Sequence, residues 1–134
     1  MRAVFFIAHR TASGGRVGIK EISTGIDSPE SFLAKILQDL TRKGIVHSVK
    51  GPNGGFYMDT QGLNQPLSAV VKAVDGEGIF TGCGMGLQYC SALNPCPLHN
   101  EFKGIRDKIQ EMMEHTTIGE FNEDLNLGIL SLRK

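Results

Sequence analysis

The sequence predicts a mostly helical fold with one small β-hairpin, the winged helix-turn-helix, and three observations predict it. Two helical segments follow each other over residues 19–44, and two strand-like runs around a turn at 51–55 come directly after them. A long segment with helical periodicity lies at 101–115. In a winged helix-turn-helix the second helix of the motif enters the major groove of DNA, and the hairpin touches the backbone or the minor groove. A plain helical hairpin closed by a turn is the alternative.

Short apolar and amphipathic stretches place the first two helices. Residues 3–8 are apolar and predict a helix that ends at the glycine-containing turn of residues 13–15. An amphipathic stretch at 19–22 predicts the second helix.

The third helix has a clear start and a clear end. Asp27 or Ser28 is placed to cap it, Pro29 suits its first position, and Gly44 suits the left-handed turn after it. Its apolar face consists of Phe32, Leu33, Ile36, Leu37 and Leu40. Its opposite face consists of Ser31, Ala34, Lys35, Gln38 and Arg42. In a helix-turn-helix, this opposite face is the one that meets the bases.

Local signals also place the elements that follow. Residues 45–50 and 56–58 predict the two strands of the hairpin, and residues 67–74 predict a short apolar helix. The helix at 101–115 carries an apolar stripe, which is typical of a core or of a dimer seam. Thr117 and Glu120 have the spacing of a capping box and predict one more short helix.

Composition excludes several classes of protein. In the 134 residues no apolar run approaches the roughly 20 needed to cross a bilayer, and residues 3–8 are too short for a secretory signal. The sequence therefore predicts a cytoplasmic protein with no membrane partner. No nucleotide-binding loop, paired carboxylates or catalytic triad is present, so we do not expect an enzyme. The net charge is zero, but residues 1–60 carry eight Lys/Arg against five Asp/Glu, whereas residues 61–134 carry six against nine.

All three cysteines lie in the stretch CGMGLQYCSALNPCPLH at residues 83–99. They are Cys83, Cys90 and Cys96, and His99 follows three residues after the last of them. An odd number of cysteines in a cytoplasmic protein favours metal or redox chemistry over a disulfide framework. Three interpretations are open: an iron-sulphur cluster, a structural zinc with three thiolates and one imidazole, and a thiol-based switch.

Several motifs in a fixed order resemble the Rrf2 family of winged-helix transcription regulators. They are KEIS at 20–23, FLAKILQDLTRKGIV at 32–46, SVKGPNGGF at 48–56, AVDG at 73–76, the three cysteines, and TTIGEF at 116–121. The resemblance covers residues 3 to 121. It implies a homodimer on partly palindromic operator DNA, with residues 101–115 as the dimer interface. It also implies that the first helix of the family begins upstream of Met1.

The resemblance also implies roles for particular residues. An iron-sulphur cluster, 2Fe-2S with 4Fe-4S as the alternative, is expected on Cys83, Cys90, Cys96 and His99. Asn100 or Glu101 is the alternative to His99. DNA contacts are expected from Ser28, Ser31, Lys35, Gln38, Lys50, Gly51, Asn53, Gly54 and Gly55. Lys50 replaces the arginine that commonly stands before the Gly-Pro of the hairpin, so we expect a lower affinity for the minor groove. Ala34-Lys35 replaces the Glu-Gln of many relatives, so the operator sequence of those relatives is not expected to apply.

These expectations divide the chain into three parts. Residues 1–76 are expected to form the winged helix-turn-helix domain and residues 77–100 the cluster-binding loop. Residues 101–134 are expected to form the dimerisation helix and a tail.

Overall fold

The computed structural model describes residues 1–127 and 132. Its first half contains the helices α1 (Arg2–Thr11), α2 (Ile19–Ile26) and α3 (Glu30–Arg42), and the strands β1 (His47–Val49) and β2 (Gly55–Tyr57). Its second half contains α4 (Thr60–Leu63), α5 (Leu67–Val74), α6 (Gly78–Thr81), α7 (His99–His115) and α8 (Ile118–Asn126). The strands β1 and β2 pair antiparallel. The predicted mostly helical fold with a small hairpin is therefore confirmed.

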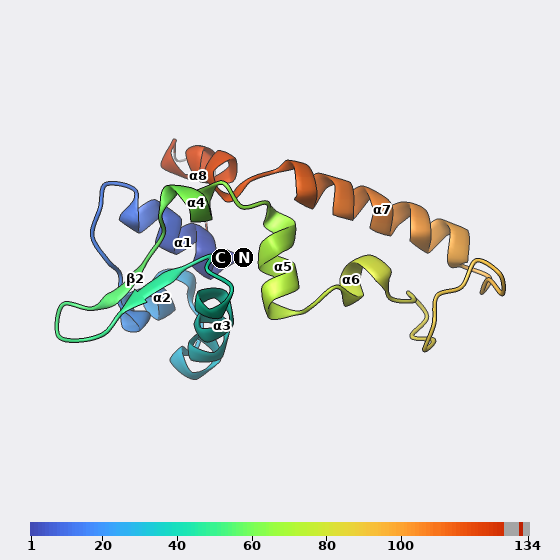
Figure 1. Cartoon of the computed structure of the whole chain (residues 1–134), viewed down its shortest axis with the longest axis horizontal. Coiled ribbons are helices and arrows are strands. Elements are labelled where there is room, and N and C mark those ends of the chain that lie inside the picture. The colour runs from blue at the N-terminus through green and yellow to red at the C-terminus, as the bar shows by residue number, and fades with distance from the viewer. Residues whose placement is uncertain (128–131, 133–134) are drawn as a thin grey trace.

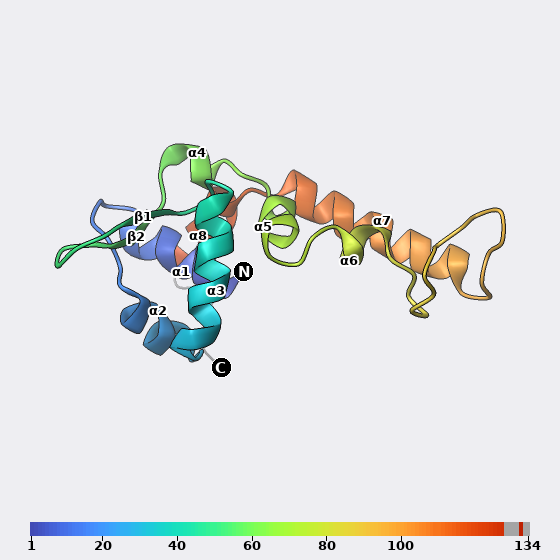
Figure 2. The same cartoon turned by 60° about the horizontal axis from the view of Figure 1, so that its bottom comes forward.

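The molecule has a body and an arm. Helices α1 to α4, α8 and the hairpin form the body, and α7 leaves it as the long arm that Figures 1 and 2 both show. Helices α5 and α6 pack against α7, and α5 also packs against α3 of the body. The segment between α6 and α7, which holds the cysteines, lies at the far end of the arm (Figure 1). Within the described residues, no helix is both long and apolar enough to span a bilayer.

The core of the body draws on both ends of the chain. Its fully buried side chains are Val4, Ile7, Val17, Ile22, Leu33, Leu37, Leu40, Val46, Val70 and Ile118. The last of these belongs to α8, which packs against α1 and α4. Two backbone hydrogen bonds hold the entry to α8 beside α5: Leu67 N–H donates to Thr116 O at 2.9 Å, and Ile118 N–H donates to Gln65 O at 3.0 Å. The chain thus returns to the body after α7, which the sequence did not predict.

The turn between α2 and α3 differs from the expectation. Asp27 ends α2 in the left-handed conformation, with φ 51°, and its N–H donates to Ser23 O. The Ser23 hydroxyl donates to Ser28 O at 2.6 Å. Pro29 occupies the cap position of α3, and no side chain caps that helix. The prediction that Asp27 or Ser28 caps α3 is therefore wrong, because both residues close the preceding helix instead.

Helix α3 buries a narrower face than its apolar residues suggested. Leu33, Leu37 and Leu40 are buried, with spacings of four and three residues that place them on one stripe. Phe32 lies about 100° around the helix from Leu33 and is 62% exposed. The prediction that Phe32 packs inside is wrong. Helix α3 ends as predicted, with Gly44 at φ 71°.

The hairpin, here called the wing (residues 47–57), also pairs with a residue outside it, Val17. Val17 N–H donates to Phe56 O and Phe56 N–H donates to Val17 O, both at 2.9 Å. Gly55, next along β2, has φ 146°, and a Cβ atom at this position would meet Val17 O at 2.9 Å. This glycine is therefore required by the packing of the wing itself, whatever the wing touches.

Candidate functional site

The three cysteines lie on an irregular segment. Residues 82–98 contain no helix or strand. Cys83, Cys90 and Cys96 are free thiols, and each is partly buried. His99 begins α7 and is only 7% exposed, so the start of the long helix fixes the imidazole beside the segment.

The four predicted donors lie in two pairs. Cys90 Sγ lies 3.3 Å from His99 Nδ1. The side chain of Cys96 lies near the Cys83 thiol and lowers its pKa, and His99 N–H donates to Cys96 O at 3.0 Å. The fold therefore brings together residues nine positions apart in one pair and thirteen in the other. Within the described part of the chain, however, no group of three or more His, Cys, Asp or Glu side chains is arranged to hold a metal ion.

Arg106 of α7 reaches into this group and was not predicted from the sequence. Its Nη1 donates to Gly82 O, to Thr81 O at 3.3 Å and to Cys90 Sγ at 3.4 Å. Its Nε is buried without a hydrogen-bond partner among the described residues. Arg106 follows His99 by seven residues, which is two helical turns. That spacing places both residues on one face of α7, and it is the feature of the sequence from which a role for Arg106 beside His99 could have been predicted.

The surroundings of Cys83 favour its thiolate. The N–H of Met85, then the N–H of Leu87, the side chain of Cys96 and the charge of Arg106 all lower the pKa of Cys83. A thiolate, rather than a thiol, binds metals and acts as a nucleophile. The local geometry of the segment thus prepares Cys83 for either kind of chemistry.

A groove of about 540 Å³ separates α3 from the wing. It brings together five of the predicted DNA-contacting residues: Gln38, Lys50, Gly51, Gly54 and Gly55. Ser31 and Lys35 are exposed on α3 outside the groove lining. Ser28 is half-buried and its backbone is engaged in the turn after α2.

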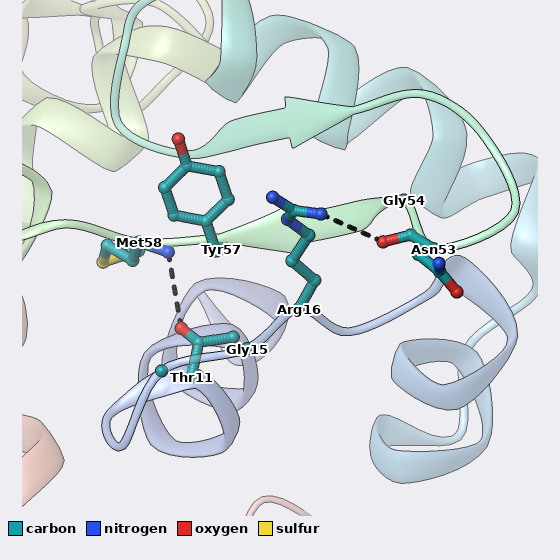
Figure 3. A pocket seen from close by; sticks show the side chains of 8 residues that line it. Thr11, Gly15, Arg16, Asn53, Gly54, Tyr57 and Met58 are labelled. Atoms are coloured by element: carbon teal, nitrogen blue, oxygen red, sulfur yellow. Dashed lines mark hydrogen bonds between the residues drawn. The ribbon is translucent and has the colours of Figure 1, made fainter.

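A second hollow of about 580 Å³ lies between the wing and the loop after α1. Asn53, the remaining predicted contact, lines this hollow together with Arg16. Arg16 extends along β2, and its Nη1 donates to Asn53 O at 3.1 Å (Figure 3). The sequence analysis did not single out Arg16.

Comparison with known proteins identifies the family. The sequence model of Rrf2, described as an iron-dependent transcriptional regulator, matches residues 1–124. The chain belongs to the Rrf2 family. This Rrf2 protein is 31% identical to an HTH-type transcriptional regulator of Aquifex aeolicus over 104 residues, which cover 76% of the chain and 72% of the relative. It is 28% identical to the HTH-type transcriptional regulator IscR of Yersinia pseudotuberculosis over 113 residues, 83% of the chain and 68% of the relative.

A solved structure supports the fold. T. potens IscR superimposes with a TM-score of 0.73 at 18% identity, covering 97% of this chain and 85% of that one. The resemblance noted in the sequence is therefore confirmed at the level of family and fold. Because the family and these relatives are transcription regulators, the Rrf2 protein is a regulator and not an enzyme.

Proposed function

We propose that this Rrf2 protein binds operator DNA as a homodimer and that its affinity for the operator responds to an iron-sulphur cluster held by Cys83, Cys90, Cys96 and His99. The observation that supports the cluster most directly is the contact of Cys90 with His99, together with the position of Cys96 near Cys83. The description of the family as iron-dependent agrees with it.

The donor set fits the chemistry of a 2Fe-2S cluster. Each of its two irons takes two protein ligands, and imidazole replaces thiolate in some proteins. The three cysteines of the irregular segment and His99 at the start of α7 supply that number of donors. When bound, the cluster supplies a redox-active and chemically labile centre. A 4Fe-4S cluster on the same residues is the alternative.

The position of the donors suggests how the presence or loss of the cluster could change the position of the DNA-binding helices. Cys90 is linked through Arg106 to the carbonyls of Thr81 and Gly82 at the end of α6. His99 is the first residue of α7. A change at the donors therefore acts on both elements of the arm. If two copies join through α7, such a change alters the spacing of the two α3 helices, which must match half-sites about one DNA turn apart.

The wing and α3 supply the proposed DNA-binding surface. Lys35 and Gln38 are exposed on α3, and Lys50 stands at the start of the wing turn. The excess of basic residues in positions 1–60 agrees with a phosphate-rich partner. We therefore assign base contacts to α3 and backbone or minor-groove contacts to the wing.

The decisive experiment is purification without oxygen, followed by a visible spectrum, iron, sulphide and zinc analysis, and DNA binding before and after cluster removal. We expect coloured protein with iron and sulphide, and an operator affinity that changes when the cluster is removed. Cys83→Ser should lose the cluster and this response, whereas Gln88→Ala, a substitution at an exposed residue of the same segment, should keep both. Colourless protein with one zinc per chain would contradict the cluster.

A thiol switch is the second candidate, and the position of the Cys96 side chain near the Cys83 thiol favours it. A peroxide would oxidise both thiols, forming one S–S bond while the peroxide is reduced to two waters. Iron-free protein whose DNA affinity changes with peroxide and recovers with dithiothreitol would support this function. In that case Cys96→Ser should abolish the response, and Cys90→Ser should leave it intact.

A further inference from the structure

The hollow between the wing and the loop after α1 has the charge of an anion site. Arg16 is the only charged residue among the eight that line it, and no carboxylate lines it. Arg10 and Arg42 in the same half of the chain pair with Glu21 and Asp39. Arg16 has no carboxylate partner within the described residues, so its charge is left for a partner outside the chain.

The guanidinium of Arg16 is held by one hydrogen bond, and its other N–H donors remain available to a ligand. One of its N–H groups donates to Asn53 O at 3.1 Å, and an arginine has five such donors in a planar fork. Arg16 is an exposed residue, and Figure 3 shows its guanidinium between Tyr57 and Asn53. A planar fork with a fixed orientation suits the oxygens of a phosphate group.

Two glycines without side chains, Gly14 and Gly15, form part of the lining of the hollow. Gly14 and Gly15 have φ of 91° and 93°, and a Cβ atom at either position would meet nothing within 4 Å. These glycines are therefore required by backbone conformation and not by crowding. Their effect on the surface is to leave room next to Arg16 for a group as large as a phosphate.

The hollow adjoins the proposed DNA-binding groove. Gly54 lines both, so the tip of the wing separates them. A wing that enters the minor groove brings its outer edge against the phosphates that border that groove. Arg16 lies on this outer edge, beside Val17, whose backbone pairs with Phe56 of β2.

We infer that the hollow formed by Arg16, Asn53 and the loop of Gly14 and Gly15 binds a phosphate of the DNA backbone at the outer edge of the wing. This inference rests on the proposed DNA binding. It adds a phosphate contact from the loop after α1 to the contacts from α3 and the wing turn.

The test is the salt dependence of binding by the full chain. Each phosphate contact adds roughly 0.9 to the slope of log K against log salt concentration. Because a dimer carries two copies of Arg16, Arg16→Gln should lower the slope by about 2, and should weaken binding to an operator and to a random duplex by the same factor. Arg16→Lys should keep the slope because it keeps the charge. Arg10→Gln, which makes the same charge change at a residue paired with Glu21, should also keep it.

Each contrary result has a distinct meaning. An unchanged slope in Arg16→Gln, with a thermal unfolding midpoint like that of the wild type, would overturn the inference and leave the proposed function standing. A wild-type protein that binds no duplex at low salt would overturn both. Arg16-dependent binding of inorganic phosphate or pyrophosphate, together with an unchanged slope on DNA, would assign the hollow to a free phosphate compound and overturn the DNA contact.

Discussion

The ring of Phe5 in α1 stacks on the ring of Phe121 in α8, with the ring centroids 4.4 Å apart and the planes 23° from parallel. The two residues lie near opposite ends of the described chain, and the whole arm stands between them in sequence. Their contact makes α8 part of the body. The body is therefore complete only when α8, which follows α7 in the sequence, has packed against α1. The chain leaves the body after α5 and returns to it at α8.

Helix α8 should therefore contribute to the stability of the body. Ile118 is fully buried, and Ile118→Ala should lower the free energy of unfolding by about 2–5 kcal/mol, the range for large-to-small changes in a core. Urea unfolding measures the difference. Leu127→Ala is the control, since Leu127 follows α8 and is 73% exposed. Equal stability of the two variants would show that α8 is only loosely attached.

Elements with local signals could be predicted from the sequence. The capping box of Thr117 and Glu120, the helix at 67–74 and the turn of the wing each depend on residues a few positions apart, and all three are present. The pairing of Val17 with Phe56 and the stacking of Phe5 on Phe121 join distant segments. Neither contact follows from periodicity, because many pairs of apolar residues fit such a pattern equally well.

The candidate site was predictable in its donors but not in its supporting residues. Cysteine and histidine are recognisable because few residue types bind metals. Arg106 and Arg16 were missed because an arginine on a helix or in a loop is usually solvated, and only the folded chain shows what it contacts. The αL conformation of Asp27 was missed for a related reason. An aspartate between two helices can end the first helix or cap the second, and the sequence does not distinguish these two roles.

Arg106 should support the cluster site. Its guanidinium donates to Cys90 Sγ and joins the segment to α6, and its charge offsets the negative charge of the thiolates. Arg106→Gln should weaken iron retention by about 10- to 100-fold, the usual effect of losing a residue that orients metal ligands. Competition with a chelator measures this, and a lower midpoint potential should accompany it because a nearby cation favours the reduced cluster.

The control for Arg106 lies on the same helix. Lys103 is exposed and pairs with Asp107, so Lys103→Gln removes one charge from α7 without touching the cysteines. Iron retention and potential should remain at their wild-type values. If both variants behaved alike, the effect would come from the total charge of α7 and not from the contacts of Arg106.

The capping box should make stability depend on pH in the acid range. Hydrogen bonds from the N–H and then from the hydroxyl of Thr117 lower the pKa of Glu120 below its ordinary value of 4.5. The unfolded chain therefore binds more protons than the folded chain as this carboxylate titrates. The stabilisation is fully present above the unfolded pKa and is lost as the pH falls through the folded pKa.

Urea unfolding midpoints between roughly pH 3 and pH 6 test this prediction. Glu120→Gln should remove this part of the pH dependence. Thr117→Ala removes the hydroxyl but keeps the backbone N–H, so its pH dependence should lie between those of the wild type and Glu120→Gln. An unaltered pH profile in Glu120→Gln would show that the box does not persist in solution.

The apolar face of α7 should join two copies of the chain. Ile105 and Met112 are each 55% exposed, and seven residues separate them, so they lie on one face as in a coiled-coil seam. Placing a charge on this face should weaken dimerisation by at least about 100-fold, because each carboxylate would be buried without a partner. The double variant Ile105→Glu, Met112→Glu should therefore sediment as a monomer at concentrations where the wild type is a dimer.

The matched control for the dimer is Glu111→Lys. Glu111 is exposed on α7 and lies about 120° around the helix from Ile105 and about 100° from Met112, so its substitution should leave the dimer intact. The monomeric variant should still bind iron, because all four proposed ligands come from one chain, but it should lose the preference for two half-sites over one. If it kept that preference, dimerisation through α7 would be wrong, and the two α3 helices would have to be joined through another surface.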